Sequence, residues 1–271
     1  MLNDITIGQY YPGNSMLHRM DPRVKLVLTF VYIFSVFIPR NWAGLAIAAG
    51  FLIFIIILSD LPAKLIFKSI KPILPLILIT SALNIFYVSK GVPLFDWGFI
   101  HITSQGLVTA VFIAIRILCL IAGSSLLTYT TSPTTLTDAL ERLLSPLKVI
   151  RLNVHELAMM MTIALRFIPT LIEETDKIMS AQKARGADME SGGVMQRIRA
   201  LIPILIPLFV SSFRRAFELA TAMECRCYRG GEGRTRMKQL HMRVSDVVYI
   251  VVMLLLAAGL FILNFILKPA L

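Results

Sequence analysis

The last apolar stretch of the chain, Val247–Leu267, contains 21 consecutive residues without a charged side chain. As an α-helix it would be about 30 Å long, which matches the hydrocarbon thickness of a bilayer. The 271-residue chain is 56% hydrophobic and only 16% charged, whereas a soluble domain is about 25% charged. Its three cysteines form no disulfide framework. This composition excludes a disordered chain, a disulfide scaffold and an ordinary soluble enzyme, and it predicts an all-α integral membrane protein.

Further apolar segments precede this one. Leu65–Val88 and Gly106–Thr128 are each long enough for one crossing, because a crossing needs roughly 17–25 residues. The first apolar region, Leu26–Leu58, is divided into two short helices by the turn sequence Pro39–Asn41. Each half is at the lower limit for a crossing, so a hairpin that enters the membrane only partway is the alternative to two full crossings. We favour two crossings, which makes about five transmembrane helices.

The distribution of Lys and Arg predicts the orientation. If the N-terminus is cytoplasmic, the segments on that side carry 23 of the 27 basic residues, the opposite side carries three, and one lies within a span. The short connecting segments alone carry six against three, and these are the segments that the positive-inside rule weighs most. We therefore expect a multi-pass protein whose N-terminus is cytoplasmic.

The basic residue within a span is Arg116, ten residues into the segment Gly106–Thr128. An arginine at a span centre costs about 2.5–3.5 kcal/mol on insertion scales, so its side chain should face protein rather than lipid. It is either a charge on a substrate path or an interhelical contact to a carbonyl or hydroxyl group. We favour the interhelical contact.

Residues 129–245, between the fourth and fifth predicted spans, hold most of the charge. These 117 residues carry 17 of the basic residues and are too many for a passive connection. Ser132 and Pro133 are typical of a helix N-cap and first helical residue. We expect three parts: an N-terminal transmembrane region with four spans (1–128), a region of long cytoplasmic or interfacial coupling helices (129–245), and a C-terminal transmembrane helix (246–271).

This region contains two similar blocks. In each, an apolar segment with prolines leads into a polar helix that ends with one arginine between small residues. The blocks align without a gap at an offset of 41 residues. The arginine triplets are Ala184-Arg185-Gly186 and Cys225-Arg226-Cys227.

The repeated arginines suggest a docking function. Small neighbours leave the guanidinium fork unshielded, so that it can enter a narrow acidic or carbonyl-lined groove. Two such arginines on two similar helices fit a partner with two similar grooves. The alternative is a pair of ordinary solvated cations that interact favourably with the helix dipole. The matched sequence context favours docking.

Sequence motifs for catalysis are absent. The chain has no phosphate-binding P-loop and no glycine-rich dinucleotide fingerprint. His155-Glu156 begins like a zinc-protease motif, but Met159 occupies the position of the second histidine, so we expect no metal site. An autonomous channel or secondary transporter stays open as an alternative. Such a protein would be expected to have a polar path and inverted repeats within its spans, whereas the repeat here lies outside them.

Taken together, these segments resemble one family over nearly the whole chain: the transmembrane T component of energy-coupling factor (ECF) transporters. No single segment is decisive, but their order and number are specific. The segments that carry the resemblance, besides the two arginine triplets, are Gly8–Tyr10, Ser15–Leu26, Thr130–Pro133, Ala139–Glu141, Pro146–Lys148, His155–Ala158, Ala164–Leu171 and Arg229–Gly231.

The resemblance implies a scaffold rather than an enzyme, in an importer of vitamins or metal ions in a bacterial or archaeal cell membrane. The family's T component holds two ATP-binding subunits through Ala-Arg-Gly-like motifs and contacts a small substrate-binding membrane subunit. ATP and magnesium are then bound by the partner subunits, and no cofactor and no nucleic acid is expected on this chain. The triplet at Arg185 fits the family pattern fully. The triplet at Arg226 departs from it, since cysteine stands on both sides; cysteine is small enough for a groove, while the turn geometry there stays open.

Overall fold

The computed structural model of the protein describes residues 10–87, 93–97, 100–150, 153–187, 193–230 and 240–267. The chain forms two compact units. The bundle unit comprises Gly8–Ala139 and Gln239–Leu271, and the helix-pair unit comprises Met1–Ile7 and Leu140–Lys238. The chain thus leaves the bundle unit after residue 139 and returns to it at residue 239.

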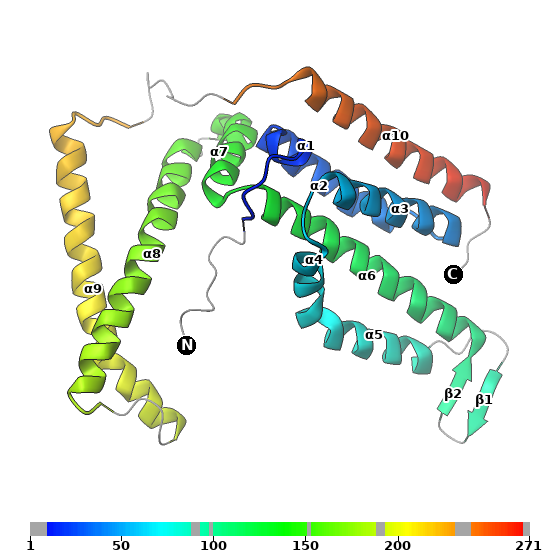
Figure 1. Cartoon of the computed structure of the whole chain (residues 1–271), viewed down its shortest axis with the longest axis horizontal. Helices are drawn as coiled ribbons and strands as arrows, with labels where there is room; N and C mark the ends of the chain where they lie inside the picture. The colour runs from blue at the N-terminus through cyan, green and yellow to red at the C-terminus, as the bar shows by residue number, and fades with distance from the viewer. Residues whose placement is uncertain are drawn as a thin grey trace. The chain divides into compact units, whose positions relative to one another are not determined.

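Nearly all of the described residues are helical (Figure 1), which confirms the expected all-α fold. The structure adds one short antiparallel hairpin, β1–β2, between α5 and α6. The elements in chain order are α1 (Met16–Arg19), α2 (Pro22–Phe37), α3 (Trp42–Leu58), α4 (Ala63–Ile70), the 3-10 helix η2 (Lys71–Ile73), α5 (Leu74–Tyr87), β1 (Pro93–Trp97), β2 (Ile100–Thr103), α6 (Ser104–Thr130), α7 (Pro133–Leu144), the 3-10 helix η3 (Ser145–Ile150), α8 (Val154–Ala184), α9 (Val194–Cys225) and α10 (Val244–Ile266).

Helix α6 is central to the bundle unit. Helices α2, α3, α4 and α5 pack on it, and α10 packs on α2 and α3. Close approach is possible because Gly123 of α6 lies against the ring of Tyr32 of α2. The Tyr32 hydroxyl donates to the carbonyl of Ala48 in α3 over 3.2 Å. In lipid, the hydrophobic effect does not drive apolar helices to associate. Close packing and interhelical hydrogen bonds of this kind therefore stabilise the bundle.

Helices α2 and α3 form the expected hairpin around Pro39–Asn41. The two helices have 16 and 17 residues. A helix that crosses the membrane has about 20 residues on average, so each of them is short for a crossing. At the turn, the Arg40 amide donates to Asn264 Oδ1 (3.0 Å) and Asn41 Nδ2 donates to the Leu263 carbonyl (3.2 Å). At the other end, the Asp21 amide donates to the carboxylate of Asp246 at the start of α10. The hairpin therefore covers nearly the full length of α10, which is 23 residues long.

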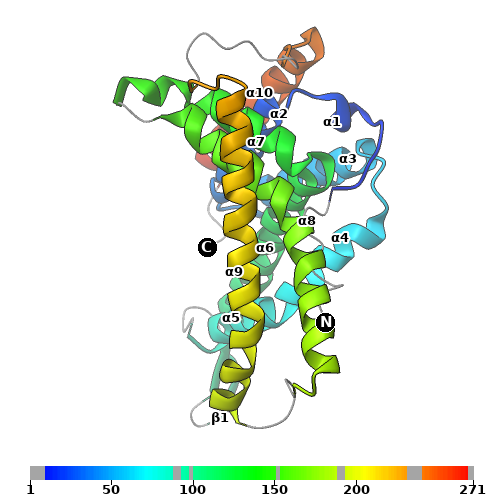
Figure 2. The ribbon, with the colours of Figure 1, turned by 90° about the vertical axis from the view of Figure 1, so that its left-hand side faces the viewer.

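The helix-pair unit consists mainly of α8 and α9, which run antiparallel (Figure 2). The prolines of this region stand where apolar segments meet polar ones, and from the sequence we expect each to break or kink the backbone. None of them ends a helix: Pro169 lies inside α8, and Pro203 and Pro207 lie inside α9. Each proline lacks an amide hydrogen, so the carbonyl four residues earlier has no helical donor.

Five helical segments of the described chain are long and apolar enough to cross a membrane, the number expected from the sequence. They are Ala63–Tyr87, α6, α8, the part of α9 from Ile198, and α10. These are not the same five segments that the sequence predicted, because they include α8 and α9 and leave out the short helices α2 and α3. The cytoplasmic placement of α8 and α9, and with it the division at residues 129 and 245, stays a prediction.

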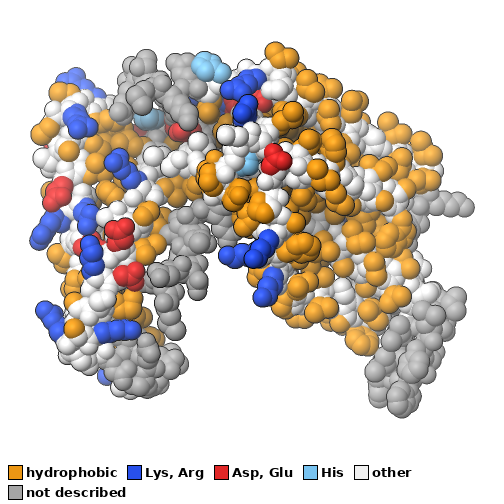
Figure 3. Space-filling view, viewed as in Figure 1, with side chains coloured by type: hydrophobic (Ala, Val, Ile, Leu, Met, Phe, Trp, Pro, Cys, Tyr) orange, Lys and Arg blue, Asp and Glu red, His pale blue; other side chains and the backbone are white. Residues whose placement is uncertain are grey.

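The surface of the bundle unit has the character of a membrane protein. Figure 3 shows hydrophobic side chains over most of its visible face, whereas Lys, Arg, Asp and Glu are scattered along α8 and α9. Phe34, Ile57, Leu78 and Phe265 are each more than two-thirds exposed in the bundle unit. Exposed apolar area on this scale indicates contact with lipid or with another protein.

Candidate functional site

Helix α8 ends at the first arginine triplet in a Schellman motif. Arg185 is the C-cap residue, and Gly186 follows it in the left-handed region at φ +85°. The amide of Gly186 donates to the Lys183 carbonyl and that of Ala187 to the Gln182 carbonyl, each with a donor–acceptor distance of 3.0 Å. These are the two hydrogen bonds that define the motif. The triplet is therefore a helix-terminating turn of defined geometry.

Helix α9 ends in the same way at the second triplet. Arg226 is the C-cap residue, and Cys227 takes the left-handed conformation at φ +56°. The amide of Cys227 donates to the Glu224 carbonyl (2.8 Å) and that of Tyr228 to the Met223 carbonyl (3.1 Å). The turn geometry that the sequence left open is thus the same in both triplets. The second adopts it without glycine, at a cost of roughly 1–2 kcal/mol for a left-handed residue with a Cβ.

Both arginines are available for a partner. Arg185 and Arg226 are exposed, as are the residues on either side of each. In the part of the chain that the structure describes, neither guanidinium takes part in a hydrogen bond or an ion pair. Each carries five donors in a rigid fork. The arrangement fits recognition of a carboxylate or of backbone carbonyls on another molecule.

The two triplets lie at opposite ends of the helix pair. Near one end, Gln182 Nε2 of α8 is 3.5 Å from the Pro203 carbonyl of α9. Near the other, the Tyr228 hydroxyl donates to the Met159 sulfur over 3.0 Å. The 23 residues of α8 between these contacts correspond to about 35 Å of helix. The structure therefore separates the two candidate sites instead of joining them in one pocket.

An ion pair joins equivalent positions of the two repeats. Arg215 Nη2 of α9 lies 2.8 Å from Glu174 Oε2 of α8, and these residues are separated by the 41-residue offset of the repeat. The contacts on either side of this pair run in opposite directions along the two helices. The helix pair therefore has approximate two-fold symmetry about the Glu174–Arg215 contact, which the alignment alone did not indicate.

Arg116, the basic residue within a predicted span, makes an interhelical contact in the bundle unit. Its Nη2 donates to the carbonyl of Pro39, at the α2–α3 turn, with a donor–acceptor distance of 2.5 Å. Its guanidinium carbon lies 4.9 Å from the centroid of the Phe112 ring and 5.9 Å from that of Phe37. Its buried Nε has no partner among the described residues. These contacts tie the middle of α6 to the hairpin turn.

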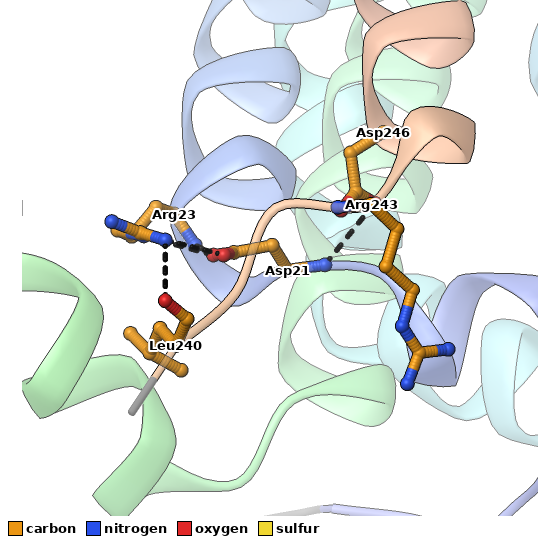
Figure 4. A network of polar contacts seen from close by, with 5 residues as sticks. All are labelled: Asp21, Arg23, Leu240, Arg243 and Asp246. Carbon is orange, nitrogen blue, oxygen red and sulfur yellow. Dashed lines mark hydrogen bonds and ion pairs between the residues drawn. The ribbon is translucent and has the colours of Figure 1, made fainter. Parts of the chain in front are cut away.

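A charged network that the sequence reasoning did not identify joins the start of α2 to the segment before α10 (Figure 4). Arg23 donates twice to the Asp21 carboxylate (2.7 and 3.1 Å) and once to the carbonyl of Leu240 (3.1 Å). The buried carboxylate of Asp246 accepts from the amides of Asp21 and Arg243. Asp21 and Arg23 belong to the segment Ser15–Leu26, which carries part of the family resemblance, but their contacts with Asp246 and Leu240 depend on a fold that brings together residues more than 200 positions apart.

Opposing influences act on the acidity of Asp21. Burial alone would raise the pKa of this carboxyl group. The hydrogen bonds from the side chain and backbone of Arg23, and the charge of Arg23, outweigh burial and leave the pKa below its usual value. The pair is thus ionised in the native state, where it holds the α2 N-terminus against the segment that leads into α10.

Among the described residues, no three His, Cys, Asp or Glu side chains come together to hold a metal ion. His155 Nδ1 instead lies 3.0 Å from Glu141 Oε1, in the helix-pair unit. Cys225 and Cys227 are free and exposed, and Cys119 is free and buried.

Comparison with known proteins gives consistent results. Residues 13–237 match the family of cobalt transport proteins named CbiQ. The chain is 54% identical to the energy-coupling factor transporter transmembrane protein EcfT of Ruminiclostridium cellulolyticum over 248 residues, which is 92% of each chain. It is 51% identical to the EcfT protein of Thermosediminibacter oceani over 98% of this chain and 100% of that one. It is 48% identical to that of Bacillus subtilis over 97% of this chain and 100% of the relative.

Proposed function

The chain belongs to the family of energy-coupling factor transporter transmembrane proteins, and from this premise we propose that it docks two ATP-binding subunits through Arg185 and Arg226. Membership makes it the membrane energy-coupling component of an ECF transporter, a non-catalytic subunit that acts with others in a cell membrane. The family resemblance inferred from the sequence is confirmed.

The observation that supports docking most directly is the identical construction of the two helix ends. In each, an exposed arginine occupies the C-cap position of a Schellman motif and has no partner within the described chain. An ordinary solvated arginine needs neither a fixed turn nor an equivalent in a second helix. A dimer of ATP-binding subunits offers two similar grooves, and two equivalent arginines about 35 Å apart along the helix pair match that symmetry.

The helix pair is suited to transmit motion between these sites. ATP binding and hydrolysis take place in the partner subunits, and a change in the spacing of their grooves moves the ends of α8 and α9 relative to each other. Among the described residues, the ion pair Glu174–Arg215 joins the two helices near the centre of their contact. They can therefore pivot there while their exposed apolar residues follow. Phe209, Phe213 and Phe217 of α9 are each at least 60% exposed and offer a surface for the substrate-binding membrane subunit.

The cargo and the orientation follow from the same proposal. The substrate, a vitamin or a metal ion, is bound by the separate membrane subunit, and this chain supplies no cofactor of its own. The excess of basic residues on one side supports a cytoplasmic N-terminus and cytoplasmic arginine triplets, on the side of the membrane where ATP is available.

Replacement of Arg185 and Arg226 by alanine, singly and together, tests the docking assignment. If each guanidinium pairs with a buried carboxylate, its loss costs about 3–5 kcal/mol, or more than about a hundred-fold in affinity. The double variant should lose both ATP-binding subunits when the complex is purified through a tag on this chain. Arg214→Ala is the matched control, because Arg214 is an exposed arginine of α9 that is not at a helix end.

Two results would contradict the proposal. Retention of both ATP-binding subunits by the double variant would show that other residues carry the docking. Equal loss in the Arg214→Ala control would show that the effect depends on overall charge and not on the two helix ends.

A further inference from the structure

A cavity of about 230 Å³ lies at one end of the bundle unit, where α2 and α10 begin and α3 and α6 end. All of its lining residues belong to this unit. Its wall is almost entirely apolar and includes Leu28, Phe51, Ile55 and Val252. An engineered apolar cavity of about 150 Å³ stays free of water and takes up benzene. A larger apolar cavity in a membrane protein is therefore suited to an apolar group and not to water.

One lining residue, Lys25, is charged, and its position is unusual. Its relative exposure is only 6%. Its Nζ donates to the carbonyl of Thr130 over 3.0 Å, which uses one of the three donors of an ammonium group. In the described part of the chain it forms no ion pair. A buried ammonium group with a single neutral acceptor is poorly satisfied.

Two acidic groups lie at the same end of the bundle unit, and the charge of one of them, Asp246, acts on Lys25 without a hydrogen bond or ion pair between the two. The Asp21 carboxylate is paired with the Arg23 guanidinium. The Asp246 carboxylate accepts hydrogen bonds from the amides of Asp21 and Arg243. Both acids are thus satisfied by local donors, and Lys25 keeps two donors and a positive charge beside an apolar cavity.

We propose that this cavity binds the alkyl chain of an anionic amphiphile and that the ammonium group of Lys25 pairs with its acidic head group. The shared chemistry is one acidic group joined to a long hydrocarbon chain. Two sources supply it: an anionic phospholipid of the surrounding bilayer, or a free fatty acid. The site lies at the end of the bundle where α2 and α10 begin, so the head group lies near the chain's network of charges and the tail extends between the helices. The proposal does not depend on ATPase docking, because the site is contained in the bundle unit.

The test uses the full chain without partners. It is reconstituted in nanodiscs of phosphatidylcholine that contain a minor fraction of phosphatidylglycerol, oleate or uncharged oleyl alcohol. Molecules that stay bound after transfer to detergent are identified by native mass spectrometry. We expect retention of one anionic amphiphile per chain, and no retention of phosphatidylcholine or oleyl alcohol.

Matched variants separate the head-group site from the cavity. Lys25→Met should weaken retention at least about tenfold, as expected for loss of a charged hydrogen bond, whereas Lys25→Arg should keep it. Lys64→Met, which removes an exposed lysine of α4, should have no effect. Val252→Trp should fill the cavity and abolish retention. Val251→Trp is its control, because Val251 is similarly exposed on α10 (49% against 44%) but does not line the cavity.

Each outcome supports or overturns the proposal. Retention of phosphatidylglycerol supports it with a bilayer lipid as the source, and retention of oleate alone supports it with a free fatty acid. Equal retention of oleate and oleyl alcohol, unchanged in Lys25→Met, would overturn the head-group pairing. Retention of no amphiphile, or the same effect of tryptophan at positions 251 and 252, would overturn the cavity as the binding site.

Discussion

The ends of α8 and α9 carry glycine and cysteine at equivalent positions, and exchanging these two residues should change the stability of the two helix ends in opposite directions. Gly186 and Cys227 occupy equivalent positions, both with positive φ, at +85° and +56°. A Cβ at Gly186 would have no atom within 4 Å, so a side chain there adds backbone strain but no clash. Glycine tolerates this conformation, whereas a residue with a Cβ loses roughly 1 kcal/mol. Cys227→Gly should therefore stabilise the last turn of α9 by about 1 kcal/mol, and Gly186→Cys should destabilise that of α8 by a similar amount.

Amide hydrogen exchange measures this difference locally. A change of about 1 kcal/mol alters the opening equilibrium of a helix end about fivefold. The amides of Cys227 and Tyr228, which donate to carbonyls of α9, should exchange about fivefold more slowly in Cys227→Gly. The equivalent amides of residues 186 and 187 should exchange about fivefold faster in Gly186→Cys. Effects of the same sign in both variants, or faster exchange in Cys227→Gly, would refute the assignment of strain to the left-handed residue.

Two further predictions concern the bundle unit. A Cβ at Gly123 would come within 2.7 Å of the buried Tyr32 ring, so Gly123→Ala should destabilise the protein by about 1–3 kcal/mol. Gly259→Ala is the control and should have no such effect, because a Cβ at Gly259 meets open space. Equal melting temperatures of the two variants in detergent would contradict the close packing of Gly123 on Tyr32. The lowered pKa of Asp21 means that the native state binds this proton less tightly than the unfolded state, whose pKa is about 3.9. Its pairing with Arg23 therefore stabilises the protein above that pH and loses this effect as the pH falls through the lowered pKa. Asp21→Asn should have a lower melting temperature than the wild type at pH 7, and this difference in melting temperature should shrink as the pH is lowered. A difference in melting temperature that stays constant with pH would contradict the ionic role of Asp21.

Several features of the fold could be predicted from local sequence. The α2–α3 turn at Pro39–Asn41 and the predicted spans Gly106–Thr128 and Val247–Leu267 agree with the structure to within a few residues, because apolar length and turn residues are local properties. The start of α7 at Pro133, with Ser132 accepting from the Thr135 amide, is also local. The continuity of α8 and α9 through their prolines was not predicted, because whether a proline ends a helix depends on what surrounds the carbonyl that it leaves free.

The candidate site was predicted in part. The 41-residue repeat identified both arginine triplets, but the sequence did not show that Cys227 would take the conformation of Gly186. Backbone strain at one residue depends on the whole turn, including the two hydrogen bonds that close it. The contacts of Arg116 with Pro39 and Phe112 follow the expectation that a membrane arginine faces protein, but their identity required the packed bundle.

Composition, periodicity and repetition are properties of neighbouring residues, and they were enough to predict an all-α membrane protein with repeated arginine-terminated helices. Contacts between residues far apart along the chain became visible only in the folded structure. It placed the two arginines at opposite ends of an antiparallel pair, paired Glu174 with Arg215, and joined Asp21 and Arg23 to the segment that starts α10. It also left Lys25 buried beside an apolar cavity. The physical reason is that burial and ion pairing depend on distances in space, which packing between helices sets and local sequence does not.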